Sequence, residues 1–336
     1  MTVVGTFGLS VRDQALEADV QAGLTAVEEG LLEATKSEVP FITEAAQHLV
    51  RAGGKRFRPL LVTLAAQFGD PYAPGIVPSA VVVELTHLAT LYHDDVMDEA
   101  DVRRGVPSAN QRWGNSVAVL TGDFLFARAS HILADLGPDA VRIQAEAFER
   151  LVTGQILETA GPADGRDPVD HYLDVLSGKT GSLIAVACRF GAMMSGADET
   201  VVDVLTQYGE RLGVAFQLAD DVLDIASDSH ESGKTPGTDL REGIATLPVL
   251  RLRERAERLG LAEDKELVEL IDSDLADDDR LAEAVASLRV HPALEQARRD
   301  TVRFAEEARS ALAPLAECDA KAALLELCDA VVHRAG

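Results

Sequence analysis

Helical periodicity recurs along most of this chain and constrains its fold more than any other feature. Apolar residues return every three or four positions in windows rich in Ala, Leu, Val, Glu and Arg. Seven long helices are predicted, at 11–36, 77–98, 116–134, 139–159, 182–195, 199–225 and 291–312. Alternating apolar and polar runs are nearly absent, and Pro and Gly gather between the windows. The sequence therefore predicts an all-α protein.

The length of 336 residues, of which 47% are hydrophobic, allows one large domain or two. The segment 161–168 is no longer than an ordinary connection between helices of a bundle. We therefore predict a single domain over residues 1–336, with a motif-bearing core at about 45–250 and C-terminal helices at 251–336 in the same domain. The acidic stretch 261–284 is typical of a solvated helical surface.

The charge balance limits the partners of the chain. It has 31 basic and 56 acidic side chains, so its formal charge is −25, which argues against nucleic acid or an anionic membrane as a partner. No secretory leader pattern and no run of about 18 uncharged apolar residues is visible, and the three cysteines form no disulfide or zinc pattern. We expect a cytoplasmic protein without stable membrane insertion.

Two acidic motifs of the form DDxxD lie in predicted helices, at 94–98 and at 220–224. Residues four apart share a helix face, so each motif presents two carboxylates about one turn apart: Asp94 with Asp98, and Asp220 with Asp224. Further back on the same faces lie His87 and Gln217. Oxygen-only ligands at this spacing suit Mg²⁺, which proteins hold with one or two carboxylates while substrate phosphates complete the shell.

Basic residues gather at several separate places in this acidic chain. In GGKRFRP, Lys55, Arg56 and Arg58 follow a Gly pair at a helix start, where a bound anion would offset the unfavourable helix dipole. Arg103 and Arg104 follow the first acidic motif and suit bidentate contacts with phosphate.

Two further lysines, Lys179 (followed by Thr180) and Lys234, have glycine neighbours and turn-like surroundings, but neither segment has Walker spacing. Together, the acidic and basic groups fit two diphosphate substrates, one bridged by metal and one held by Lys and Arg alone.

These residues resemble the trans-type isoprenyl diphosphate synthases of the polyprenyl synthetase family. Seven blocks stand in the family's order: GGKRFRP, HDDVMDEADVRRG, GDFLFARA, GQILE, GKTGSL, FQLADDVLD and GKTPGTDLREG. The resemblance implies an all-α bundle of antiparallel helices around a central cavity, a homodimer and three Mg²⁺ ions. It also implies head-to-tail 1'-4 condensation of isopentenyl diphosphate with an allylic diphosphate.

By that similarity, each candidate residue receives a role. The isopentenyl diphosphate would be held by Lys55, Arg58, His87 and Arg104, and the allylic diphosphate by Arg103, Lys179, Gln217 and Lys234. Asp94, Asp98 and Asp220 would ligate Mg²⁺ directly, and Asp224 through water. Lys179, Thr180 and Gln217 would act at the reacting carbon, where oxygen dipoles stabilise an allylic cation. Many relatives carry a lysine at the position of Ile244, so one diphosphate contact is missing.

Product length is expected to depend on residues about one turn before Asp94. Ala89 and Thr90 are small, whereas relatives with short products carry an aromatic plug there. Phe124 and Phe126 are candidates for a tunnel floor, although either is also a plausible core residue. One isoprene unit spans about one helical turn, so we predict a product of about C30 to C50, with geranylgeranyl diphosphate as the alternative.

Three other functions are weighed against this one. A class I terpene cyclase binds a single diphosphate and normally lacks the GGKxxRP pocket. A regulatory subunit of a heteromeric prenyl synthase usually loses an acidic motif, and both motifs stand here. A purely structural helical protein gives no reason for seven ordered motifs. Transient membrane contact is a further hypothesis, because so apolar a product has to leave the enzyme.

Overall fold

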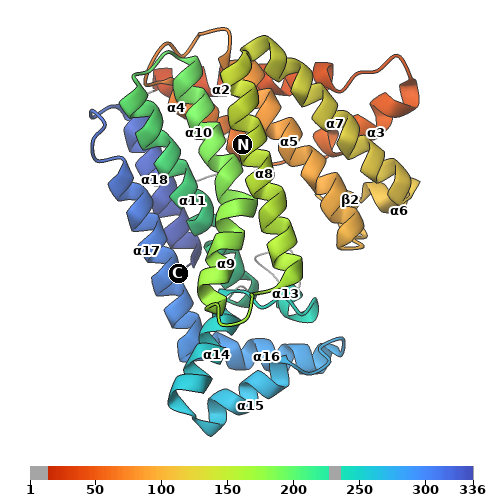
Figure 1. Ribbon diagram of the computed structural model, residues 1–336, viewed down its shortest axis with the longest axis vertical. Helices are drawn as coiled ribbons and strands as arrows, with labels where there is room; N and C mark the ends of the chain where they lie inside the picture. The colour runs from red at the N-terminus through yellow and green to blue at the C-terminus, as the bar shows by residue number, and fades with distance from the viewer. Residues whose placement is uncertain (1–13, 227–235, 336) are drawn as a thin grey trace. The chain divides into compact units, whose positions relative to one another are not determined.

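The computed structural model describes residues 14–226 and 236–335, and the structure of this part is almost entirely α-helical (Figure 1). All seven predicted helical windows are helices there, with ends that agree within one or two residues. Residues 11–13 of the first window lie outside the described residues. The prediction of an all-α fold is confirmed.

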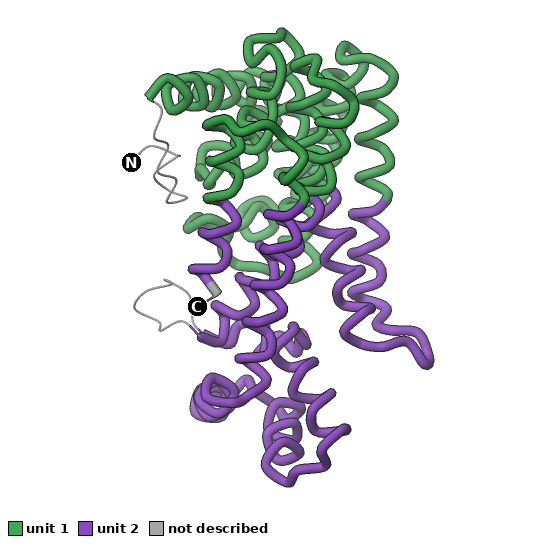
Figure 2. The backbone as a smooth tube through the Cα atoms, turned by 90° about the vertical axis from the view of Figure 1, so that its left-hand side faces the viewer, with its two compact units in different colours: residues 1–149, 183–209, 311–326 green, residues 150–182, 210–310, 327–336 purple. Residues whose placement is uncertain are grey.

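The chain divides into two compact units, each built from three stretches (Figure 2). Unit 1 comprises Met1–Glu149, Leu183–Gly209 and Ala311–Glu326, and unit 2 comprises Arg150–Ser182, Glu210–Ser310 and Leu327–Gly336. The single domain over 1–336 stays a prediction.

Unit 1 contains the N-terminal helices and a short hairpin: α2 (Gln14–Ala34), α3 (Pro40–Arg51), α4 (Phe57–Ala66), α5 (Ile76–Met97), β1 (Val102–Arg103), β2 (Val106–Pro107), α6 (Ala109–Trp113) and α7 (Asn115–Leu136). Residues of both units belong to α8 (Pro138–Ala160), α10 (Ser182–Met194), α11 (Glu199–Ala226), α17 (Pro292–Ala311) and α18 (Asp319–Ala335). Unit 2 adds α9 (Pro168–Leu176), η1 (Ser177–Gly181), α13 (Thr238–Arg241), α14 (Leu247–Leu259), α15 (Ala262–Ile271) and α16 (Asp278–Arg289).

Helix α5 is anchored in the core of unit 1 by a buried tyrosine close to the first acidic motif. The Tyr92 hydroxyl donates to the Ala45 carbonyl at 2.6 Å and accepts from the Leu49 N–H at 3.3 Å, which ties α5 to α3. On the side of α7, Gly122 is needed for close approach, because a Cβ there would come within 2.3 Å of the His93 ring. The packing of unit 1 thus fixes the end of α5 that carries Asp94.

The hairpin β1–β2 is a local exception that the all-α prediction did not include. Val102 pairs with Pro107 and Arg103 with Val106, and both loop residues, Arg104 and Gly105, have positive φ. Two positive φ values in a two-residue loop match the turn whose twist suits a β-hairpin. This turn fixes the directions of Arg103 and Arg104 just after the first acidic motif.

Lys179 lies in a π-helical turn, so the prediction of turn-like surroundings was wrong. α9, η1 and α10 follow one another without a break, and η1 holds the motif SGKTG. The neighbouring helix α8 lies so close that a Cβ at Gly154 would come within 2.8 Å of the backbone nitrogen of Lys179. A Cβ at Gly178 would likewise meet the Arg150 carbonyl at 2.8 Å. These glycines allow the backbone of α8 to touch η1, and π-turns of this kind often occur at functional sites.

The acidic stretch 261–284 forms two helices, α15 and α16, and most of its side chains are exposed as predicted. Asp264 is an exception, because its carboxylate is buried and contacts Arg255 at 3.1 Å and His291 at 3.0 Å. The stretch is therefore a surface that is anchored by one buried acid.

Helix α7 is long and apolar enough to cross a membrane by length and composition, with a mean hydropathy of 1.3. The core helix of a soluble protein passes the same test, so this is weak evidence for a span. Asp123 and Arg128 interrupt the apolar sequence, which is why a count of uncharged residues missed it.

Candidate active site

The first acidic motif ends helix α5. Asp94 lies in the last turn, and Asp98 caps the helix with its N–H bonded to the Asp94 carbonyl at 2.8 Å. Asp94 is partly accessible and the side chain of Asp98 is 54% exposed, whereas Asp95 between them is buried. Two carboxylates are thus presented at the helix end, and the third has a different role.

Asp95 is held by the hairpin. Arg103 Nε lies 2.5 Å from Asp95 Oδ1, and Arg103 Nη2 lies 3.9 Å from Asp98 Oδ2. Burial raises the pKa of Asp95, and the hydrogen bond from Arg103 opposes that rise. Arg103, predicted to contact the allylic diphosphate, therefore pairs with the acidic motif, and its predicted role stays a prediction.

The two arginines of GGKRFRP differ in how their guanidinium groups are satisfied. Arg56, at positive φ before α4, forms a buried ion pair with Glu84 and a partly exposed one with Glu28. Arg58 lies two residues further on, and its buried Nε has no hydrogen-bond partner among the described residues. Burial lowers the pKa of Arg58 to about 10. A buried donor without a partner is costly, so Arg58 is set to receive an acceptor.

Two other predicted ligands of isopentenyl diphosphate, Arg104 and His87, interact electrostatically with Arg58. Arg104 donates to the Leu49 carbonyl at 3.2 Å and to the Gly53 carbonyl, and its guanidinium would lie 2.9 Å from a Cβ at Gly54. The GGK glycine is therefore needed to make room for Arg104. Burial lowers the pKa of His87 well below its usual value, and the charges of Arg58 and Arg104 lower it further. Lys55 is exposed.

In unit 2, the predicted catalytic residues lie on η1 and α11. Lys179 Nζ pairs with Glu158 of α8 at 2.6 Å. Thr180 Oγ1 donates to Gln217 Oε1 at 3.5 Å, and Gln217 Nε2 donates to Asp221 Oδ1 at 3.3 Å. The structure thus brings Thr180 and Gln217 into contact, and their catalytic role stays a prediction.

Each aspartate of the second motif contacts a different kind of group. Asp220 Oδ1 accepts from Arg334 of α18 at 2.7 Å, and the Arg334 guanidinium lies over the Phe216 ring at 4.7 Å. Asp224 accepts from the backbone N–H groups of Thr238 and Asp239, both at 3.2 Å. Asp224 thus receives two backbone donors, and Asp220 pairs with an arginine.

Asp221 is buried and accepts a hydrogen bond from the Tyr172 hydroxyl of α9. Burial raises the pKa of Asp221 to about 8, while the hydrogen bonds from Tyr172 and Gln217 oppose the rise. A divalent cation at Asp220 and Asp224 would favour the ionised form of Asp221.

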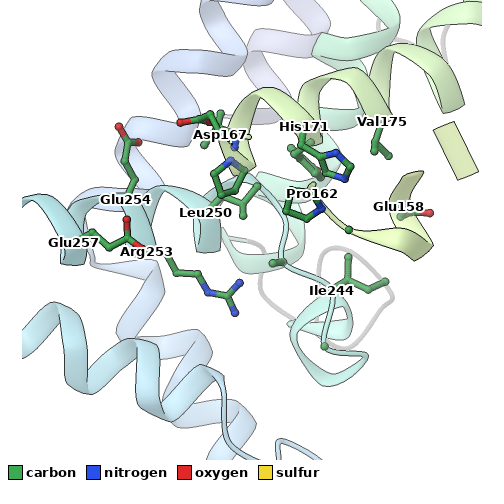
Figure 3. A pocket seen from close by; sticks show the side chains of 16 residues that line it. Glu158, Pro162, Asp167, His171, Val175, Ile244, Leu250, Arg253, Glu254 and Glu257 are labelled. Atoms are coloured by element: carbon green, nitrogen blue, oxygen red, sulfur yellow. Dashed lines mark hydrogen bonds between the residues drawn. The ribbon is translucent and has the colours of Figure 1, made fainter. Parts of the chain in front are cut away.

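Unit 2 also contains a cavity of about 450 Å³ (Figure 3). It is lined by Tyr172 and His171 of α9, by Glu158 of α8, by Leu250 and Arg253 of α14, and by Ile244. Ile244, where a lysine was expected from the resemblance, faces this largely apolar space. Lys234 lies outside the described residues.

The donor set of the acidic motifs fits Mg²⁺. Within 14–226 and 236–335, no three His, Cys, Asp or Glu side chains form a ready metal-binding group. Each motif instead offers a pair of hard carboxylate oxygens one turn apart, Asp94 with Asp98 and Asp220 with Asp224. Mg²⁺ prefers such sparse protein ligation, in which water and phosphate oxygens complete the octahedron.

The residues predicted to govern product length lie in unit 1. Ala89 is fully buried, and a Cβ at Gly122 of α7 would lie 3.1 Å from its carbonyl oxygen. The Phe126 ring packs against His93 at 5.8 Å and Phe148 at 4.5 Å between centroids. Phe126 therefore belongs to an aromatic cluster next to the first acidic motif.

The all-α fold and the two carboxylate pairs define an isoprenoid synthase. A geranylgeranyl pyrophosphate synthase from Corynebacterium glutamicum, solved with calcium and isoprenyl diphosphate, superposes with a TM-score of 0.86 at 43% identity, covering 97% of this chain and 99% of that one. A decaprenyl diphosphate synthase from Rhodobacter capsulatus gives 0.85 at 37% identity, covering 96% and 99%.

The family model described as polyprenyl synthetase matches residues 39–288. Nonaprenyl diphosphate synthase of Mycobacterium tuberculosis is 46% identical over 331 residues, covering 98% of this chain and 97% of that protein. This chain belongs to the polyprenyl synthetase family, and it is a prenyltransferase.

Sequence reasoning missed Tyr172, Glu158 and Arg334, which contact the predicted site residues Asp221, Lys179 and Asp220. Glu158 belongs to the block GQILE, which is one of the seven motifs of the resemblance and could have indicated this residue. Arg334 and Tyr172 carry no local signal, because they lie 114 and 49 residues from their partners.

Proposed function

We propose that this member of the family makes a long-chain polyprenyl diphosphate of about C30 to C50, by adding isopentenyl diphosphate head-to-tail to an allylic diphosphate. The observation that carries the proposal is the coexistence of the carboxylate pairs with a separate arginine, Arg58, whose buried Nε has no hydrogen-bond partner among the described residues. An enzyme that binds one metal-bridged diphosphate needs no second cationic pocket.

Arg58, Arg104, His87 and Lys55 are the residues that bind isopentenyl diphosphate in this proposal. Phosphate oxygens supply the acceptor that Arg58 Nε lacks, and bidentate contacts with Arg104 add orientation. His87 is kept neutral by burial and by the neighbouring arginines, so it donates through one ring N–H without adding charge.

Asp94, Asp98, Asp220 and Asp224 hold Mg²⁺, three ions in total by the family resemblance, with Asp224 acting through water. When bound, Mg²⁺ withdraws charge from the allylic diphosphate and eases departure of that group. Arg103, Lys179 and Lys234 contact the same diphosphate. The ammonium group of Lys179 is already oriented by its ion pair with Glu158.

Thr180 and Gln217 direct oxygen dipoles at the allylic carbon as positive charge develops there. The contact between Thr180 Oγ1 and Gln217 Oε1 supports this role, because it brings the two oxygens to 3.5 Å. The isopentenyl double bond then forms the new carbon–carbon bond, and the released diphosphate takes the proton.

A homodimer is part of the proposal. Helix α7 exposes apolar side chains in unit 1, with Leu120 65% exposed and Val119 39% exposed. Burial of such a surface against a second copy is favourable by about 25 cal/mol per Å² of apolar area. Sedimentation of wild type and Leu120→Lys tests this, and a monomeric wild type would contradict it.

Cytoplasmic location and transient membrane contact stay predictions. Cell fractionation tests the first. Flotation with neutral liposomes after turnover tests the second, and protein that remains at the bottom of the gradient would count against membrane contact.

Product analysis tests the proposed function directly. Purified protein is given Mg²⁺, labelled isopentenyl diphosphate and each allylic starter in turn, and the dephosphorylated products are separated by reverse-phase chromatography. Products of C30 or longer are expected. A stop at C20 would support geranylgeranyl diphosphate as the product, and no incorporation would favour a subunit that needs a partner.

A further inference from the structure

A partly buried chain of hydrogen bonds leads from α9 to the predicted catalytic residues of unit 2. The Tyr172 hydroxyl donates to Asp221 Oδ2, and Gln217 Nε2 donates to Asp221 Oδ1 at 3.3 Å. Gln217 Oε1 in turn accepts from Thr180 Oγ1 at 3.5 Å. Tyr172 and Asp221 received no role from the sequence, and neither is needed to ligate metal or phosphate in the proposed function.

The direction of the Gln217 amide matters for catalysis. A side-chain amide has a carbonyl oxygen at one end and two N–H donors at the other, and rotation by 180° exchanges them. The NH₂ end of Gln217 donates to Asp221 Oδ1 and its oxygen accepts from Thr180 Oγ1, so hydrogen bonds at both ends set the direction of the amide. The reversed amide would present N–H groups, whose positive ends repel a developing cation.

Asp221 needs a support of its own. Its carboxylate is buried, and the Tyr172 hydroxyl engages the oxygen that Gln217 does not use. Tyr172 also lines the cavity of about 450 Å³, so one side of its surroundings lacks close packing. The hydrogen bond therefore contributes strongly to holding the ring and the carboxylate in one arrangement.

We propose that Tyr172 and Asp221 are positioning residues, which fix the side-chain amide of Gln217 with its oxygen directed at the reacting carbon. This inference rests on the role proposed for Gln217. Tyr172 acts through Asp221, and Asp221 acts through Gln217, so neither residue touches substrate.

The test is a double-mutant cycle with Tyr172→Phe and Gln217→Ala, measured as kcat and as KM for each substrate. Tyr172→Phe is expected to lower kcat about 10-fold, the equivalent of one hydrogen bond, with both KM values within about 3-fold of wild type. In the Gln217→Ala background the same change is expected to alter kcat less than about 3-fold, because no amide remains to be oriented.

A matched control is Tyr208→Phe. Tyr208 is a fully buried tyrosine whose hydroxyl donates to the Leu324 carbonyl at 2.8 Å in unit 1. Its loss should lower Tm and leave kcat unchanged. If Tyr172→Phe does not fold, Asp221→Asn is used, since an Asn can turn its own NH₂ toward Gln217 and reverse the amide; the same non-additivity is expected.

The outcomes separate the two ideas. If Gln217→Ala has wild-type kcat, the role proposed for Gln217 fails. If Gln217→Ala is slow but Tyr172→Phe costs as much in that background as in wild type, the positioning inference is overturned and the proposed function stands. A Tyr172→Phe enzyme with wild-type kcat would overturn the inference as well.

Discussion

The two acidic motifs have the same sequence pattern, yet the structure supports them by different means. In unit 1, the middle aspartate, Asp95, is buried against the charged Arg103 of the following hairpin. In unit 2, the corresponding Asp221 is buried against the neutral groups of Tyr172 and Gln217. The difference teaches that the motif specifies two accessible carboxylates one turn apart, whereas the surrounding fold determines how the buried carboxylate between them is compensated.

The largest expected effect is a loss of kcat when an accessible aspartate is removed from either motif, because the two motifs are proposed to share one role. If Asp94 and Asp220 are both metal ligands, Asp94→Ala and Asp220→Ala should each lower kcat by about 10³-fold, because several kcal/mol of charge stabilisation are lost. Steady-state kinetics over a Mg²⁺ titration measures this. Asp203→Ala, at an exposed position of α11, is the control. If one of the two variants lost less than 10-fold in kcat, the two motifs would not contribute equally to metal binding.

A substitution at Arg58 tests whether the two substrates bind in separate pockets. Arg58→Met removes a buried cation with an unpaired Nε, so the free protein should gain about 1–3 kcal/mol of stability. The KM for isopentenyl diphosphate should nevertheless rise about 100-fold, while the allylic KM stays within a few-fold. Thermal unfolding and separate substrate titrations give both quantities, and equal changes in the two KM values would argue against two pockets.

The arginines beside the two motifs should differ in their effect on stability. Arg103→Ala leaves the fully buried Asp95 without a cation and should cost about 3 kcal/mol. Arg334→Ala breaks a pair that is partly exposed on both sides and should cost less than about 1 kcal/mol. Urea unfolding of both variants tests this contrast. Equal losses would mean that the two pairs are equivalent.

The smallest effect is a dependence on pH from His87. Its pKa is lowered in the folded protein, so the unfolded chain takes up a proton first as the pH falls below about 6.5. Stability should be highest above that pH and fall by up to about 1.4 kcal/mol per unit below it. His87→Gln should flatten this slope in unfolding curves between pH 5 and 7, and His131→Gln, at an exposed position of α7, should not.

Much of the fold could be predicted, because helical periodicity and Gly or Pro breaks are local. Windows such as 199–225 and 291–312 match α11 and α17 closely. The hairpin at 102–107 was not predicted, since two-residue strands carry no periodic signal and depend on the positive φ values of Arg104 and Gly105. The glycines on either side of Lys179 favour a turn by sequence, whereas in the structure Gly178 allows backbone contact with α8 and Gly181 allows close approach to α11.

Candidate residues within motifs could be predicted, but the division of labour inside a motif could not. Arg56 and Arg58 read alike in GGKRFRP, and only the positions of Glu28 and Glu84 make the first structural and leave the Nε of the second without a hydrogen-bond partner among the described residues. Asp94 and Asp95 read alike as well, and only burial against Arg103 separates them. Such choices depend on residues distant along the chain.

The sequence by itself determined the helices, the ordered motifs and the chemistry of paired carboxylates with separate cations, because these depend on residue type and on spacing within a few turns. The tertiary structure alone decided which charges are compensated. It placed Arg334 on Asp220 across 114 residues and Tyr172 on Asp221 across 49. The physical reason is that burial and hydrogen bonding are set by packing between helices, and packing partners cannot be read from local spacing.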